Sequence, residues 1–304
     1  MTENKAGREE RKQCVGTYGG ALGSVLRRPF IIIFLGVVTL AFCIINYYNP
    51  VFTLMFGLQG LKGGNLLDGM MSFIQLPVGF VSDAGTAVKA LAAVIFILAV
   101  FSIIAGIALS GFFHILNTAL EGKKELKGGF MHGIGKYFFK TVLINFRAGF
   151  FGILFILFMM VASVPAIITT KTLTAGRTEL LLPVIFLDIL TAVVLFFSFM
   201  AFRIYMFFWY PSAFNTEKSA FITGKRTADK HFWRITGSMV LFDLVLAAFQ
   251  ILIMYLQNIA SVHKTGITPL PAVLFMANWI FKTAYFTFFM TYIFHAFKKY
   301  YLQK

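Results

Sequence analysis

Six long apolar runs constrain the fold of this chain more than any other feature. Each reaches the roughly 20 residues that a helix needs to cross the hydrocarbon core of a bilayer. Only 13% of the residues are charged and 59% are hydrophobic, a balance that is not typical of a soluble domain. The sequence therefore predicts an all-α fold, a polytopic membrane helix bundle with about six transmembrane helices and cytoplasmic interfacial helices. The runs lie near residues 29–47, 88–118, 141–170, 180–212, 235–260 and 271–297.

Basic residues are distributed unevenly among the connections of these runs. Nineteen of them lie before the first run, in the connections 119–140 and 213–234, or after the last run, against four in the alternate connections. Lys and Arg are enriched in cytoplasmic loops, so both termini and these two connections are predicted to be cytoplasmic, in a cell membrane. Residues 49–86 and 261–270 then face outward, and 49–86 is either an outer loop or a re-entrant segment.

The charge pattern also indicates the domain organisation and excludes one class of partner. Residues 1–28 are predicted to be a basic cytoplasmic segment, 29–297 a single six-span transmembrane domain, and 298–304 a cytoplasmic tail. The net charge of +15 is divided among four short segments, whereas nucleic-acid binding needs one basic footprint. We therefore expect no nucleic-acid partner.

Three basic segments that lead into an apolar run resemble one another. Phe30, Phe138 and Phe232 each follow a basic residue closely. Their alignment predicts three copies of one unit, an interfacial helix followed by a helical hairpin, as in transporters built from parallel repeats. The alternative is chance similarity, because any basic loop before a span has this composition.

The stretch SAFITGKRTADKHFWRITGSMVLFDLVL combines a helix led by small residues, a turn at Gly224-Lys225 and an aromatic-basic step at Phe232, Trp233 and Arg234. It resembles the loop-to-span segment of a loosely defined set of uncharacterised bacterial six-span membrane proteins. These are related to the membrane domain fused to some glycerophosphodiester phosphodiesterases. The resemblance implies no activity, because the hydrolase chemistry of those fusions belongs to a separate domain.

No catalytic, cofactor or metal site is predicted. The sequence has none of the patterns of zinc proteases, α/β-hydrolases, phosphate-binding loops or dinucleotide-binding folds. Its five His are scattered, and neither Cys14 nor Cys43 lies at ligand spacing from a His. We expect both cysteines to be reduced and the protein not to be an enzyme.

Five charged residues lie well inside the apolar runs, where an unpaired charge costs at least about 2.5 kcal/mol. Arg147 is shallow enough to extend to nearby headgroups. Arg203 and Asp243 lie about 12–13 Å from the cytoplasmic ends of their runs, and are predicted to pair, either as a structural bridge or at a substrate site. Asp188 and Lys282 lie about 13–16 Å from the outer face. They form a second candidate pair nearer the midplane, where transporters bind substrates.

Small residues recur at four-residue spacing on the second run, at Ser102, Gly106 and Ser110. Such a ridge lets two helices approach closely, and it also occurs in the lining of pores. We predict the close helix contact.

Basic residues beside aromatic anchors are candidate contacts for lipid headgroups, since amphipathic segments of this kind bind anionic membranes. The sequence thus predicts a non-enzymatic multi-pass protein that binds or organises anionic lipids on the cytoplasmic side, or membrane-protein partners. The alternative is a small transporter or permease that uses the charged residues inside the spans. The candidate headgroup contacts are Lys136, Lys140, Lys225, Arg226, Lys230 and Arg234.

Overall fold

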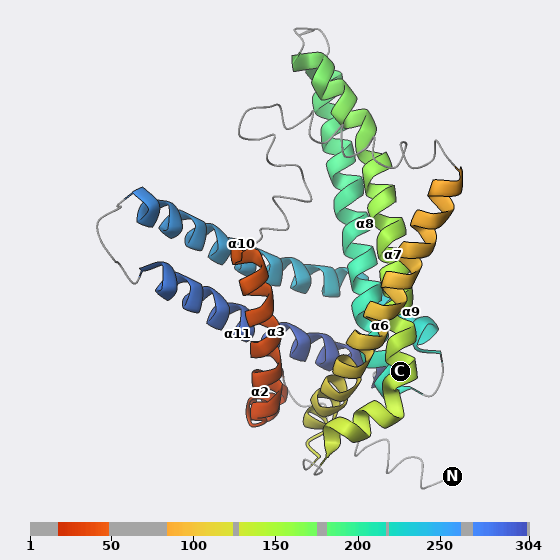
Figure 1. Cartoon of the computed structure of the whole chain (residues 1–304), viewed down its shortest axis with the longest axis vertical. Helices are drawn as coiled ribbons and strands as arrows, with labels where there is room; N and C mark the ends of the chain where they lie inside the picture. Colours follow the sequence, from red (N-terminus) through yellow and green to blue (C-terminus); the bar gives the residue numbers. More distant parts are fainter. Residues whose placement is uncertain are drawn as a thin grey trace. The chain divides into compact units, whose positions relative to one another are not determined.

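All six apolar runs are helical. The computed structural model describes residues 18–48, 84–123, 128–174, 181–216, 219–262 and 270–302, and every secondary-structure element in these ranges is an α-helix (Figure 1). The long helices are α3 (Pro29–Tyr48), α6 (Ala84–Leu120), α7 (Gly129–Thr174), α8 (Leu181–Asn215), α10 (Phe232–Val262) and α11 (Leu270–Leu302). Two short helices, α2 (Tyr18–Leu26) and α9 (Ala220–Lys230), precede α3 and α10.

The polytopic all-α fold predicted from the sequence is confirmed. Within the described residues, five helices are long and apolar enough to cross a membrane, and α3 makes a sixth candidate when it is combined with α2, from which it is bent by 83°. The helices also extend beyond a bilayer. α7 has 46 residues, which at 1.5 Å per residue is about 69 Å, more than twice the roughly 30 Å hydrocarbon core.

The two basic connections are shorter than the sequence indicates, because the flanking helices extend into them. α6 continues to Leu120 and α7 begins at Gly129, so much of 119–140 is helical. α8 continues to Asn215, and α9 occupies much of 213–234. A helix need not end where its apolar run ends, since polar side chains can continue it in water. The connection 49–86, which is predicted to face outward, lies outside the described residues apart from the start of α6, as do the segments 1–17, 263–269 and 303–304.

A short helix followed by a long one recurs in two of the three segments that were aligned as repeats. α2 and α3 are separated at Arg27 and Arg28, and α9 and α10 at His231. In the remaining segment, the residues around Phe138 belong to the continuous helix α7. The separate short helix of the predicted unit is therefore absent from the second copy.

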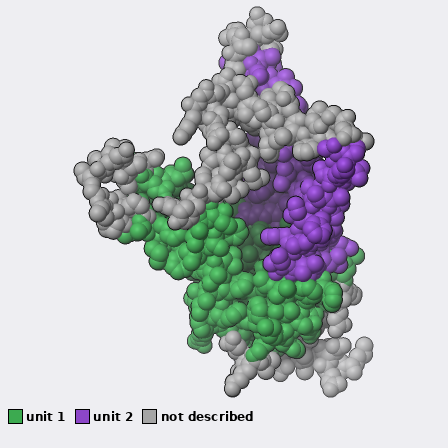
Figure 2. All heavy atoms as spheres, in the orientation of Figure 1, with its two compact units in different colours: residues 1–45, 106–141, 204–304 green, residues 46–105, 142–203 purple. Residues whose placement is uncertain are grey.

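The chain divides into two compact units (Figure 2). Unit 1 comprises residues 1–45, 106–141 and 204–304, and unit 2 comprises 46–105 and 142–203. The boundaries fall inside α6, α7 and α8 and near the end of α3, so each of these helices contributes to both units. The assignment of 29–297 to a single domain stays a prediction.

Aromatic rings form much of the core of unit 1. The ring centroid of Phe113 on α6 lies 5.1 Å from that of Phe294 on α11 and 5.0 Å from that of Tyr210 on α8. Phe208 on α8 and Phe297 on α11, both fully buried, lie 5.9 Å apart. Offset and edge-on ring contacts stabilise a core beyond the area that they bury. Phenylalanine rings therefore pack α6, α8 and α11 together in unit 1, in addition to supplying apolar surface.

Unit 2 packs parts of α6, α7 and α8 through small residues and stacked rings. Ser102 on α6 is fully buried, and its carbonyl accepts a hydrogen bond of 3.4 Å from Asn145 on α7. Phe155 on α7 and Phe202 on α8 stack with centroids 4.5 Å apart. The ridge at Ser102 is thus a close helix contact, as predicted.

Many other apolar side chains, including Phe96, are exposed in the protein alone, which suits a surface covered by lipid tails.

Candidate functional site

Asp188 lies in unit 2, where a hydroxyl of the neighbouring helix contacts its carboxylate. Thr170 Oγ1 on α7 lies 3.2 Å from Asp188 Oδ1 and 3.1 Å from Oδ2, and donates to the carboxylate. A donor of this kind partly replaces the water that an apolar environment excludes. This contact places Asp188 near the C-terminal end of α7, which ends at Thr174. The sequence did not reveal this contact, because Thr170 carries no charge to draw attention to it.

Lys282 lies in unit 1, at the contact between α11 and α3. It lies near Cys43 on α3. The hydroxyls of Thr283 and Thr39 are 2.7 Å apart, and Trp279 donates its indole N–H to the carbonyl of Gly36 at 2.8 Å. These polar contacts attach α3 to α11.

Each predicted charge pair has one residue in unit 1 and the other in unit 2. Arg203 is the last residue of unit 2 and Asp243 lies on α10 in unit 1, and both side chains are half-buried. Asp188 and Lys282 are divided in the same way. Both pairings therefore stay predictions. Arg147 on α7 is exposed, and its extension to the headgroups stays a prediction.

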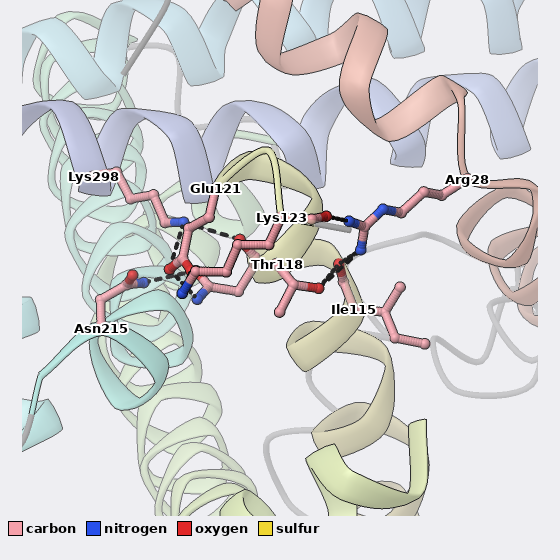
Figure 3. Close-up of polar contacts among 8 residues, drawn as sticks. Arg28, Ile115, Thr118, Glu121, Lys123, Asn215 and Lys298 are labelled. Carbon is pink, nitrogen blue, oxygen red and sulfur yellow. Dashed lines mark hydrogen bonds and ion pairs between the residues drawn. The ribbon is translucent and has the colours of Figure 1, made fainter. Parts of the chain in front are cut away.

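A polar cluster, which we call the α6 node, surrounds the C-terminal end of α6 (Figure 3). Gly122 follows the helix with a φ of +65°, a conformation that favours glycine. Its N–H donates to the carbonyl of Ala119 at 3.0 Å, and the N–H of Lys123 donates to that of Thr118 at 3.3 Å. These two bonds form a Schellman C-cap. The node consists of Arg28, Ile115, Asn117, Thr118, Glu121, Lys123, Asn215 and Lys298.

Arg28, which precedes α3, donates to oxygen atoms at this end of α6. Its Nη1 bonds to the carbonyl of Ile115 at 3.2 Å and to Thr118 Oγ1 at 2.9 Å, and its Nη2 bonds to the carbonyl of Lys123. The last carbonyls of a helix lack intrahelical partners and carry negative partial charge. The buried guanidinium bonds to one carbonyl near the end of α6, to one side-chain hydroxyl and to one carbonyl just beyond the helix. Its positive charge therefore lies at this negative helix end and fixes the start of α3 against α6.

Lys298 connects α11 to the same node. Its Nζ donates to the carbonyl of Asn117 at 3.0 Å and to Glu121 Oε1 at 3.3 Å, and its side chain is only 10% exposed. Lys123 Nζ lies 2.6 Å from Glu121 Oε2. Burial acts to raise the pKa of Glu121, but the charges of Lys298 and Lys123 hold that pKa below its ordinary value. Asn215 on α8 donates to Asn117 Oδ1 at 3.0 Å.

The α6 node brings together helix ends that the sequence assigns to the same side of the membrane: the ends of α6, α8 and α11 and the start of α3. Arg28 and Lys298 are among the nineteen basic residues from which the sequence predicts only the topology. Gly122 after an apolar run is a sequence signal for the cap, but the cations that complete it lie 95 and 177 positions from their partners Lys123 and Glu121. The node binds helix carbonyls, so its role is structural.

α9 carries exposed basic and apolar side chains on one face, and its other face, centred on Gly224, is buried. Ile222 is 70% exposed on this helix, and Trp233 at the start of α10 is 72% exposed. Such a combination of cations and apolar anchors is typical of helices that lie in the headgroup layer. We call this surface the basic stripe, and it consists of Ile222, Lys225, Arg226, Lys230, Trp233 and Arg234.

Gly224 permits close contact between α9 and α8. A Cβ at this position would lie 2.9 Å from the carbonyl oxygen of Phe208 and 3.1 Å from its carbonyl carbon. Trp209 packs on Phe221 with ring centroids 5.0 Å apart, and Tyr205 donates to Asp229 Oδ1 at 2.6 Å. The predicted turn at Gly224-Lys225 is wrong, because both residues lie inside α9. Glycine is required there by the neighbouring backbone and not by a turn.

A second exposed surface lies at the start of α7. Lys136 and Lys140 are exposed there, as is Met131, and Phe139 is 84% exposed. Lys136 also lies over the ring of Tyr137, 5.4 Å from its centroid. All six residues predicted to contact headgroups are thus exposed on unit 1.

No family model, no curated protein and no solved structure matches the chain. The resemblance to bacterial six-span membrane proteins therefore stays a prediction. Within the described ranges, no group of three or more His, Cys, Asp or Glu side chains is placed to hold a metal ion.

Proposed function

We propose that this multi-pass membrane protein binds anionic lipid headgroups on its cytoplasmic side, and that it organises lipids or partner proteins without catalysing a reaction. The observation that supports this proposal is the basic stripe, where cations and large apolar side chains are exposed together. The apolar side chains can enter the acyl boundary while the cations meet phosphates. Lys136, Lys140 and Phe139 at the start of α7 offer the same combination.

Neutralising Lys136 and Lys140 with glutamine should weaken the binding of anionic lipid. Each basic residue near a membrane surface contributes about 1 kcal/mol, so the double variant should lose roughly tenfold or more in affinity. The measurement is energy transfer from the tryptophans to dansyl-labelled phosphatidylglycerol, with the full chain in phosphatidylcholine nanodiscs. High salt should reduce the wild-type signal in the same way.

The matched control removes the same charge from the opposite ends of the helices. Lys89 on α6 and Lys171 on α7 are both exposed, and their replacement with glutamine should leave the affinity nearly unchanged. Equal losses in the two double variants, or equal binding of labelled phosphatidylcholine, would contradict the proposal.

A second candidate function, a small transporter or permease, is favoured by the carboxylate of Asp188 between two apolar helices. If Thr170 only stabilises that carboxylate, Thr170→Val should lower the free energy of unfolding by about 1.5–3 kcal/mol, the usual contribution of a hydrogen bond to a charged group. Replacing Asp188 with leucine in addition should restore the stability, because an apolar pair needs no donor.

Thermal unfolding in detergent checks this prediction. Thr172→Val is the control, since Thr172 Oγ1 donates to two carbonyls of its own helix. If the double variant is stable, yet fails to complement a growth defect of the deletion strain, the transporter gains support. Full complementation by that variant would count against it.

A further inference from the structure

The elbow between α9 and α10, residues 230–234, holds a histidine between two cations. His231 caps α9 with its N–H, which donates to the carbonyl of Ala228 at 3.2 Å. Its ring stacks on Tyr300 of α11, with centroids 4.2 Å apart and planes inclined by 15°. Its Nε2 atom is buried and has no hydrogen-bond partner among the described residues. Buried polar nitrogen atoms are rarely left in this state.

The groups around His231 disfavour its protonated form. α9 contributes Lys230, α10 contributes Arg234, and α11 contributes the phenol of Tyr300, which is neutral near pH 7. Burial, together with the charges of Lys230 and Arg234, lowers the pKa of His231. The adjacent acid, Asp229, is hydrogen-bonded to Tyr205 of α8. An imidazolium at this position would therefore lie beside two like charges without an acceptor.

We propose that this elbow is a proton-linked binding site for the phosphate of an anionic phospholipid. Lys230 and Arg234 contact the phosphate, and His231 takes up a proton from solvent as the lipid binds. This inference rests on the proposed function and adds the identity of one lipid site and its dependence on pH. The phosphate supplies the negative charge that the elbow lacks.

The exposed neighbours of the elbow indicate a lipid and not a free anion. Trp233 projects from it with 72% of its surface exposed, and tryptophan favours the headgroup level of a membrane. A phosphate beside Lys230 and Arg234 cancels the repulsion that keeps His231 neutral. Binding and protonation then strengthen each other equally, since linkage is reciprocal. Affinity should therefore rise as the pH falls through the range in which imidazole titrates.

The test uses the full chain in phosphatidylcholine nanodiscs that contain brominated phosphatidylglycerol, whose bromines quench Trp233. The signal of the elbow is the part of the quenching that Trp233→Phe abolishes. Acidification from about pH 7.5 to about pH 5.5 should increase the affinity, by up to tenfold for each unit by which binding raises the pKa of His231. Replacement of His231 with glutamine should retain binding at pH 7.5 and lose the increase.

Lys225 and Arg226 provide the matched control, because they belong to the basic stripe but not to the elbow. Their double replacement with glutamine should weaken binding at both pH values and preserve the increase on acidification. An increase that persists in His231→Gln overturns the inference. Should that variant unfold, carbon-13 NMR of labelled histidines in the wild type decides. An imidazole whose pKa rises when phosphatidylglycerol replaces phosphatidylcholine supports the proposal, and five unchanged histidines refute it.

Two further outcomes separate this inference from the function on which it rests. Quenching that is equal for brominated phosphatidylglycerol and brominated phosphatidylcholine at both pH values overturns the proposed function itself. A preference for phosphatidylglycerol without any pH dependence overturns only the proton linkage. Displacement of the lipid by inorganic phosphate at comparable concentration would identify the ligand as a free anion and refute the lipid assignment.

Discussion

Replacing Gly224 with valine should separate α9 from α8 and destabilise unit 1. The added Cβ would lie 2.9 Å from the carbonyl oxygen of Phe208, a backbone atom that cannot move aside as the end of a flexible side chain can. Overpacking of this kind costs about 1–3 kcal/mol, and more when backbone must shift. We expect a lower midpoint of thermal unfolding in detergent, and faster proteolysis between α8 and α10.

Gly237 offers the matched control for this substitution. It is also a glycine inside a helix, but a Cβ there meets nothing within 4 Å. Gly237→Val introduces the same side chain with the same helix propensity, so it should leave unfolding and proteolysis close to wild type. If the two valine variants lose the same stability, Gly224 is not needed for the close contact between α9 and α8.

Replacing Lys298 with methionine should produce the second large loss of stability. The substitution keeps most of the side-chain volume but removes the cation from Glu121 and from the carbonyl of Asn117. Hydrogen bonds that involve a charged group contribute about 1.5–3 kcal/mol each. The adjacent Lys299 is exposed, so Lys299→Met removes the same charge and should have little effect. Chemical denaturation of the two variants in detergent gives the comparison.

The loss of stability caused by Lys298→Met should also depend on pH. The pKa of Glu121 is below its ordinary value of 4.5, so the folded protein binds fewer protons there than the unfolded chain. The resulting stability is present above about pH 4.5 and is lost as the pH falls through the lower, folded-state pKa. The difference between Lys298→Met and wild type should therefore shrink under acid conditions. A difference that stays constant from neutral to acid pH would mean that Glu121 is not the partner that matters.

The helices could be predicted from the sequence because they depend on local composition. In a membrane, the backbone N–H and C=O groups of a run such as 88–118 must form hydrogen bonds within the protein. A helix forms these bonds within one segment, whatever its neighbours are. The ends of the helices were less predictable, as the extension of α7 to Gly129 shows. No Pro or Gly lies at the start of the apolar run 141–170, so nothing in the local sequence ends the helix there.

The α6 node and the docking of α9 could not be predicted, because both depend on contacts between distant positions. Glu121 and Lys298 are ordinary charges at the ends of apolar runs until the fold places them 3.3 Å apart. Gly224 has the appearance of a turn residue until the backbone of Phe208 is seen beside it. The exposure of Lys225 and Arg226, in contrast, followed from charge alone, since an unpaired cation is rarely buried.

The α6 node also constrains the order in which the chain can assemble. Its carboxylate and its buried ammonium are 177 positions apart, and α7, α8, α9 and α10 are synthesised between them. While the ribosome is making those helices, the end of α6 has its Schellman turn and Arg28 but lacks Lys298. Unit 1 is thus completed only when α11 arrives, and a nascent chain that stops before α11 presents Glu121 and the carbonyl of Asn117 without that lysine. The helix that is made last among those described acts as the closing element of the first unit.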